Sequence, residues 1–275
     1  METRFSGKGV SVGLGTVGEG ERTSGCYALF CCVFIIIATS PLSAATIFGV
    51  GAGDSQGIYS INVDSGTTTL LFATPGIEWY GATDGDDESS IFGASLDGHL
   101  YRIDVVEKTI AAVGPFELAA IKELAYDESA DVLYGTDHSS LYSIDTATAK
   151  TALIGSLGAD AFWALDYDTS MGKLVGVGGE DSIYYIETAT AAAAIVGSTG
   201  QDRITDLWHD AVSGKILAVA CNPNGLYTMD SSGPAIPIWA INERILGLGC
   251  PLPEPGTLVL IASALPFAMR RRRAA

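Results

Sequence analysis

Positive charge is scarce in the central part of the chain. Residues 46–252 contain 8 Lys and Arg against 28 Asp and Glu, a net charge of −20 with His neutral, whereas the whole chain carries −17. Nucleic acids and anionic lipid headgroups are also negative, so such a field repels both. We therefore predict no nucleic-acid partner. The charge keeps an exported protein soluble, and it attracts divalent cations or cationic polymers.

Residues suited to catalysis are also few. The chain has three histidines and no HExxH, GxSxG, P-loop or CxxC motif. His99, His138 and His209 fall at different offsets of the repeat described below, so we do not expect them to form a ring. The stretch GVGAGDSQG at residues 49–57 is followed by neither a Lys nor a helix, which indicates a hairpin turn instead of a nucleotide loop. We predict no cofactor and a protein that is not an enzyme.

The densest acidic cluster is DGDDE at residues 84–88. It lacks the D-x-D-x-D-G spacing and the final Glu of an EF-hand loop. One interpretation is a solvated turn. The other is a weak Ca²⁺ site with Asp84, Asp86 and Asp87 as candidate ligands.

The apolar run near the N-terminus is too short to span a membrane. Residues 26–39 form 14 uncharged positions, whereas a spanning helix needs ~20. Pro41 ends the run, and the small residues Ser43 and Ala45 occupy the −3 and −1 places of a cleavage after Ala45. Three cations precede the run: Arg4, Lys8 and Arg22. This order predicts a signal peptide over residues 1–45, removed by signal peptidase, with a buried core helix as the alternative.

The C-terminal segment, residues 253–275, has an unusual order of residue types. Two prolines prevent a helix at residues 252–256, and 13 uncharged residues, 257–269, then follow. As a helix these span ~20 Å, less than the ~30 Å hydrocarbon core, so snorkelling arginines would have to help. The arginines hold the terminus in the cytoplasm and leave the rest of the chain outside.

This tail resembles the PEP-CTERM sorting signal. The matching residues are Pro253, Glu254, Pro255, Arg270, Arg271, Arg272 and Arg273. The resemblance implies that an exosortase-type membrane protease recognises the tail and cuts near the motif. The tail departs from that family's pattern at two positions: Gly256 stands where Ser or Ala is commoner, and Pro266 interrupts the apolar run. A plain C-terminal membrane anchor is the alternative.

The two ends together predict an exported protein. It is transiently anchored in the inner membrane and then delivered to the cell surface or extracellular matrix of a Gram-negative-type bacterium. The family resemblance implies an association with exopolysaccharide or biofilm.

A repeat of about 42 residues fills the central part. Its five copies begin 44, 42, 41 and 42 residues apart, and each holds four short segments rich in β-branched and aromatic residues. The copies begin at Ile47, Ile91, Leu133, Leu174 and Ile216. Four strands per ~42 residues is the period of a β-propeller blade. The LYxID…LYG pattern resembles propeller repeats of the YVTN/NHL-like kind.

The order of the strands predicts how the ring closes. The repeat starts on a second strand and ends on RILGLGC, an innermost strand. We therefore expect an all-β, five-bladed β-propeller over residues 46–252, closed by its C-terminal strand, with a signal peptide before it and a hydrophobic sorting helix after it. Acids and one Asn recur just after strands, where they favour turns: Asn62, Asp104, Asp127, Asp145, Asp168, Glu187, Asp210 and Asp230. Glu187 is too long for an Asx turn.

Five cysteines are present, and three of them leave with the signal peptide. Cys221 and Cys250 remain in an oxidising compartment, so they either form a disulfide or stay as two separate buried thiols. Trp79, Trp163 and Trp208 recur near the innermost strands. They are candidate ligand-facing residues at one mouth of the channel, or else they fill space between blades.

Three functions are consistent with these patterns. The first is a non-catalytic surface module that binds extracellular polysaccharide or protein. The second is a secreted propeller enzyme, a lyase or hydrolase acting on matrix glycans or small esters. The third is a structural component of an extracellular polymer. Histidines that meet carboxylates in the channel would favour the enzyme.

Overall fold

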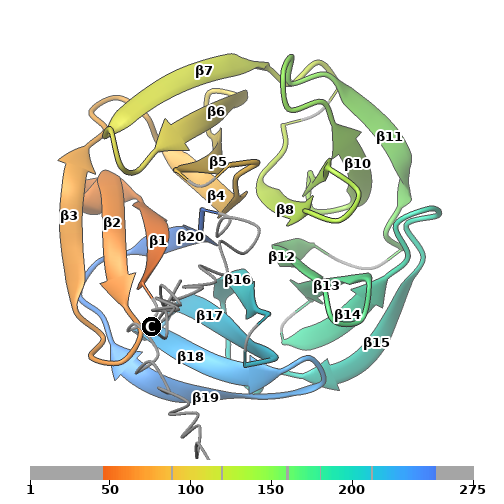
Figure 1. The fold of residues 1–275 in the computed structure, drawn as a ribbon. Coiled ribbons are helices and arrows are strands. Elements are labelled where there is room, and N and C mark those ends of the chain that lie inside the picture. The colour runs from red at the N-terminus through yellow and green to blue at the C-terminus, as the bar shows by residue number, and fades with distance from the viewer. Residues whose placement is uncertain are drawn as a thin grey trace, which may run out of the picture. The chain divides into compact units, whose positions relative to one another are not determined.

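The computed structural model describes residues 46–251, except positions 88, 119, 159–160, 180 and 212. Over these residues the chain forms five four-stranded antiparallel sheets arranged around a central axis (Figure 1). The predicted signal peptide, with Ser43 and Ala45, and the predicted sorting segment, 253–275, lie outside the described residues. In the described part of the chain, no helix has the length and apolar character needed to cross a membrane.

Each sheet is one blade, and in every blade the strands follow one another outwards from the axis. Blade 1 contains β20 (Ile245–Gly249), β1 (Thr46–Gly51), β2 (Gly57–Asn62) and β3 (Thr68–Ala73). Blade 2 contains β4 (Trp79–Asp84), β5 (Ser90–Ser95), β6 (His99–Asp104) and β7 (Thr109–Pro115). Blade 3 contains β8 (Glu123–Asp127), β9 (Val132–Thr136), β10 (Ser140–Ile144) and β11 (Thr151–Ser156). Blade 4 contains β12 (Phe162–Asp168), β13 (Lys173–Gly178), β14 (Ser182–Ile186) and β15 (Ala193–Ser198). Blade 5 contains β16 (Ile204–Asp210), β17 (Lys215–Cys221), β18 (Asn224–Asp230) and β19 (Gly233–Ala240). One 3₁₀ turn, η1 (Gly53–Ser55), joins β1 to β2.

The last strand closes the ring, as the repeat predicts. Strand β20 pairs with β1 in antiparallel register, with Phe48 opposite Gly249 and Gly49 opposite Leu248. Figure 1 shows the orange first strands and the blue last strand side by side in this blade. Because the final strand completes the first blade, the innermost edges of the sheets are protected around the whole ring.

Burial differs between the inner and outer strands for a physical reason. Each sheet packs both of its faces against neighbouring blades, so all five residues of β8 are buried. The outermost strands β3, β7, β11 and β15 are half exposed. The core therefore consists of apolar clusters between adjacent blades, such as the cluster of Val50, Ile58 and Trp79.

The predicted Asx turns are confirmed where the side-chain oxygen accepts a backbone N–H two or three residues further on. This holds at Asn62, Asp104, Asp127, Asp145 and Asp168. Glu187 and Asp230 accept hydrogen bonds from lysine side chains instead. Short turns of this kind keep the repeat compact, because each aspartate satisfies backbone donors that no strand pairs.

The five innermost strands β4, β8, β12, β16 and β20 contact one another around the axis. We call the end of the ring where these strands begin the N-face, and the end where they finish the C-face. Glycine permits the closest of these contacts. A Cβ atom at Gly247 of β20 would lie 2.3 Å from the backbone nitrogen of Ala82 on β4. The candidate site is a cavity at the N-face.

Candidate functional site

A cavity of about 670 Å³ lies at the N-face, where the channel opens. Every innermost strand contributes a residue to it: Tyr80, Glu123, Trp163, Ile204 and Leu246. The connecting loops add further polar and charged residues: His138, Asp202, Arg203, Cys221 and Arg244. We call this cavity the channel mouth. Its size is that of a typical small-ligand pocket, and its aromatic and charged lining provides both stacking and hydrogen-bonding groups.

Trp163 offers an accessible aromatic surface at the channel mouth. Its side chain is 46% exposed, and the His138 ring packs against it with 4.4 Å between the ring centroids and an angle of 54°. His138 is held in turn through Nδ1, which contacts the carbonyl oxygen of Phe162. Burial lowers the pKa of His138, with Lys122 contributing further and the Phe162 contact acting in the opposite direction. His138 is therefore neutral at pH 7 and positions the indole.

Glu123 brings a buried carboxyl group to the same cavity. The whole Glu123 residue is 4% exposed, and the Oε2 atom of its carboxyl group has no hydrogen-bond partner among the described residues. Gly81 of the neighbouring blade leaves the space for it, because a Cβ atom there would lie 2.8 Å from this oxygen. Burial raises the pKa of Glu123 well above its usual value, and the nearby charge of Asp206 raises it further. A buried, unpartnered carboxyl at a cavity wall favours the protonated form, which can donate a hydrogen bond.

Two further carboxyl groups lie deeper in the ring. Asp206 is fully buried, and its two oxygens accept hydrogen bonds from the backbone N–H groups of Leu207 at 2.9 Å and Leu248 at 2.6 Å. Asp166 is also buried, and its Oδ2 atom has no partner in the described part of the chain. Burial raises the pKa of both groups well above the usual aspartate value.

The sequence patterns described above do not identify Glu123 and Asp206 as buried acids. A signal was present, because Glu123 and Asp206 each stand four residues before the aspartate that ends their strand, Asp127 and Asp210. An acid at an equivalent position of an otherwise apolar innermost strand cannot be a turn-former. It indicates a group placed beside the axis.

Cations gather at the channel mouth, although the surrounding protein is acidic. Arg203 and Arg244 line the cavity, and the Lys122 ammonium lies 5.4 Å from the centroid of the Tyr80 ring. Arg102, Lys173 and Lys215 form ion pairs with acids elsewhere. Within the described ranges, Lys122, Arg203 and Arg244 have no such partner. The cavity lining thus holds two arginines, Arg203 and Arg244, against one exposed carboxylate, Asp202.

Only one of the three predicted tryptophans reaches the cavity, and that is Trp163. Trp79 is 2% exposed, and its indole nitrogen donates a hydrogen bond to Thr74 Oγ1 at 3.0 Å. It fills space between blades 1 and 2, which was the alternative interpretation. Trp208 is half-buried and donates to Asp84 at 2.9 Å near the C-face.

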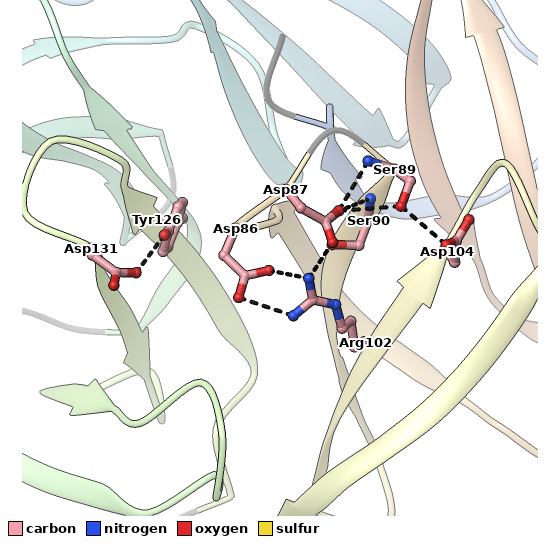
Figure 2. Close-up of polar contacts among 8 residues, drawn as sticks. All are labelled: Asp86, Asp87, Ser89, Ser90, Arg102, Asp104, Tyr126 and Asp131. Atoms are coloured by element: carbon pink, nitrogen blue, oxygen red, sulfur yellow. Dashed lines mark hydrogen bonds and ion pairs between the residues drawn. The ribbon is translucent and has the colours of Figure 1, made fainter. Parts of the chain in front are cut away.

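The acidic cluster after β4 does not bring its three aspartates together. The Arg102 guanidinium lies between Asp86 and Asp87 and pairs with both (Figure 2). Burial raises the pKa of Asp87, but hydrogen bonds from Ser89 and Ser90 and the Arg102 charge outweigh it and hold this pKa well below the usual value. Across the described residues, no group of three or more His, Cys, Asp or Glu is placed to hold a metal ion.

Asp84, the third candidate ligand, takes part in a different contact. Its Oδ1 atom accepts the backbone N–H of Cys250 at 2.6 Å as well as the Trp208 indole. Burial raises the pKa of Asp84 to about 6. The structure thus corrects the hypothesis of a weak Ca²⁺ site at Asp84, Asp86 and Asp87, because the cluster is a structural turn with its own cation.

The two cysteines are free thiols, so the disulfide alternative is wrong. Cys221 lines the channel mouth at the N-face, whereas Cys250 follows β20 at the C-face. Strand β17 ends where β20 begins, and this antiparallel arrangement places the cysteines at opposite ends of the ring. Burial raises the pKa of Cys250 to about 12, and the charges of Asp84 and Asp210 add to that effect.

The histidines do not form a ring, as predicted. His99 lies beside Asp97 in the turn before β6. His209 is buried, with Nε2 at 3.3 Å from Asp168 Oδ1, between blades 4 and 5. His138 shares the channel mouth with Glu123.

The fold has relatives among solved structures. A chain in the crystal structure of a nidogen/laminin complex aligns over 74% of this chain and 97% of its own length, with 10% identity and a TM-score of 0.55. This protein, as its repeat pattern predicts, is thus a five-bladed β-propeller. A protein of unknown function from Bacteroides thetaiotaomicron aligns over 68% of this chain and 53% of its own, with 19% identity and a TM-score of 0.48. A chain of a mitotic checkpoint complex aligns over 71% and 78%, with 17% identity and a TM-score of 0.44.

No protein-family model matches the sequence, and no curated protein matches it either. At these identities the structural likeness shows the fold alone. Propellers host many functions, so the function of this β-propeller has to be argued from its channel mouth.

Proposed function

We propose that this protein is an exported, non-catalytic binding module of the cell surface or extracellular matrix, and that its propeller holds an extracellular polysaccharide at the channel mouth. The observation that carries the proposal is the cavity itself. An exposed indole, Trp163, and a buried carboxyl group, Glu123, face one space of about 670 Å³. Aromatic rings stack on the apolar faces of sugars, and carboxyl groups bond their hydroxyls.

The export part of the proposal rests on the sequence. Strand β1 begins at Thr46, the residue after the predicted cleavage, and β20 ends at Gly249, shortly before Pro253. All five blades are complete within that span, so the ring needs neither the predicted signal peptide nor the predicted sorting segment. This agrees with two processing events, by signal peptidase and by an exosortase-type protease, that leave the propeller whole.

A catalytic function is the second candidate, because His138 and Glu123 both line the channel mouth. A hydrolase acting on glycans needs a second carboxyl group free to act on the substrate. Asp206, whose charge raises the pKa of Glu123, has both oxygens occupied by backbone donors. Asp202 is the other carboxyl group of the cavity, but it is exposed and no hydrogen bond or ion pair among the described residues orients it, so the binding function is the better supported. Release of reducing sugar from matrix glycans by the wild type, lost in Glu123→Gln, would establish the enzyme instead.

The sorting proposal is tested by the intact mass of the protein from surface and medium fractions of its native host. We expect a species that starts at Thr46 and ends between residues 253 and 256. A species that stays with the membrane and retains Arg270, Arg271, Arg272 and Arg273 would show a plain anchor and end the sorting proposal.

The binding proposal is tested by co-sedimentation of the purified protein with polysaccharide from the same matrix. We expect Trp163→Ala to abolish co-sedimentation. Trp239→Ala is the matched control, because Trp239 is 38% exposed on the outermost strand of blade 5. Equal binding by both variants would exclude the channel mouth as the site.

A further inference from the structure

We propose that the ligand of the channel mouth is an acidic sugar, a pyranose bearing a carboxylate, and that Arg203 and Arg244 bind this carboxylate. The inference rests on the proposed binding function and adds the chemical class of the ligand. It adds the charge of Arg203 and Arg244, which the binding proposal does not use.

The first argument is the distribution of cations. Residues 46–252 contain only 8 Lys and Arg, with a net charge of −20. Two of the eight line the channel mouth, and Lys122 adjoins it. In the part of the chain that the structure describes, none of these three has an ion-pair partner. Asp202 is the one exposed carboxylate on the same lining, so the two arginines outnumber it, and an anionic ligand supplies the partner that the second arginine lacks.

The second argument is the position of the two arginines in the chain. Arg203 immediately precedes β16, and Arg244 immediately precedes β20, on adjacent blades. Their backbones are anchored, because the Arg203 carbonyl accepts the Cys221 N–H at 3.2 Å and the Arg244 carbonyl accepts the Ala52 N–H at 3.0 Å. The planar guanidinium donors match the two oxygens of a carboxylate better than a lysine ammonium does.

The third argument is the buried carboxyl of Glu123. The groups that face it are Lys122 on its own strand, Asp206 on β16 and the backbone of Gly81 on β4. Burial and Asp206 raise its pKa and so favour a neutral carboxyl group, which does not repel an anionic sugar. Glu123 lines the cavity, and a protonated carboxyl group there donates a hydrogen bond to a sugar hydroxyl or ring oxygen.

The fourth argument is the exposed face of Trp163. A pyranose ring has apolar C–H faces that pack on an indole, whereas a bare inorganic anion or an acidic side chain does not need one. Trp163, Glu123 and the two arginines line one cavity, so an oligosaccharide bound there has all four side chains on its walls.

The experiment is calorimetric titration of the purified protein with tetragalacturonate and with a neutral galactotetraose of the same length. We expect binding of the acidic sugar and at least tenfold weaker binding of the neutral one. Arg203→Gln and Arg244→Gln should each weaken binding of tetragalacturonate by about tenfold or more. Lys150→Gln is the matched control. It removes one exposed positive charge between β10 and β11, away from the N-face, and should leave the affinity unchanged.

The pH dependence of the affinity for tetragalacturonate gives a second readout. If Glu123 donates a hydrogen bond, affinity for tetragalacturonate is highest where this group is protonated and falls as the pH rises through its raised pKa. Glu123→Gln keeps a donor that does not titrate, so this variant should bind with a flatter pH profile. An unchanged profile would remove Glu123 from the site.

The outcomes separate this inference from the proposed function. If both sugars bind equally and the arginine variants behave like the wild type, the ligand class is wrong while the channel mouth remains a binding site. If neither sugar binds but matrix co-sedimentation still depends on Trp163, the acidic sugar is again wrong. If oligoglutamate binds with the same arginine dependence and tetragalacturonate does not, the partner is an acidic polypeptide. If sugar binding and co-sedimentation both fail, both proposals fall.

Discussion

The indole N–H of Trp208 donates a hydrogen bond to Asp84 at 2.9 Å, across 124 positions of sequence. Trp208 belongs to blade 5 and Asp84 to blade 2, and blade 1 lies between them. The same carboxyl oxygen accepts the backbone N–H of Cys250, directly after the closing strand, at 2.6 Å. One buried carboxyl thus joins three blades at the C-face. At the N-face, by contrast, the channel-mouth residues Arg203 and Arg244 have no ion-pair partner among the described residues.

The stability of the protein should fall as the pH rises from about 4 to about 7. Burial raises the pKa of Asp84 from 3.8 to about 6, so the folded state binds more protons than the unfolded state between those values. Raising the pH through that window costs on the order of 3 kcal/mol for this group alone. Asp166, Asp206 and Glu123 act in the same direction, because burial raises each of their pKa values.

Urea unfolding at several pH values checks this. The lowered pKa values of Asp87 and Asp97 give stability that is lost at more acidic pH, so we expect a maximum in the mildly acidic range. Asp84→Asn keeps an acceptor oxygen and should flatten the slope above pH 4. Stability that rises from pH 4 to 7 in the wild type would contradict the prediction.

Gly247→Ala should destabilise the closing strand. A Cβ atom there would lie 2.3 Å from the Ala82 nitrogen and 2.6 Å from the Gly81 carbonyl carbon, and neither backbone atom can move without separating β20 from β4. We expect a loss of about 1–3 kcal/mol in the free energy of unfolding. Gly233→Ala is the control, because a Cβ atom at Gly233 meets nothing within 4 Å. Equal midpoints in thermal unfolding for the two variants would show that the ring tolerates the added atom.

Trp79→Ala and Trp163→Ala should separate stability from binding. Removing the buried Trp79 ring leaves a cavity between blades and an unpaired Thr74 hydroxyl, so we expect a loss of about 3–5 kcal/mol. Removing the exposed Trp163 ring should change stability by about 0.5 kcal/mol or less. Chemical denaturation followed by circular dichroism measures both. A large loss in Trp163→Ala would mean that this ring is a structural element.

The two cysteines should react with a thiol reagent at different rates. Cys221 lines an open cavity, whereas burial raises the pKa of Cys250 to about 12 and leaves little thiolate at pH 8. We expect iodoacetamide to label Cys221 first, and Cys250 only after unfolding, as peptide mass spectrometry would show. A purified protein that takes up no label even when unfolded would contain the disulfide that the structure lacks.

The sequence by itself determined the repeat, the number of blades and the closure. A period of about 42 residues, short β-branched segments and aspartates after strands each act locally, so the order of residues suffices to predict them. The closing strand was also predictable, because the chain begins on a second strand and finishes on an innermost one.

The tertiary structure alone decided which of these residues face the channel mouth. Trp79 pairs with Ser95 and is buried, whereas Trp163 lies at the register shift of β12, next to the paired and buried Phe162, and is 46% exposed. Cys221 and Cys250 lie 29 residues apart and at opposite faces. Glu123, Arg203 and Arg244 line one cavity only because the ring brings three blades to one axis. Sequence spacing sets the position of a residue along its strand, but its neighbours across the axis depend on how the blades pack.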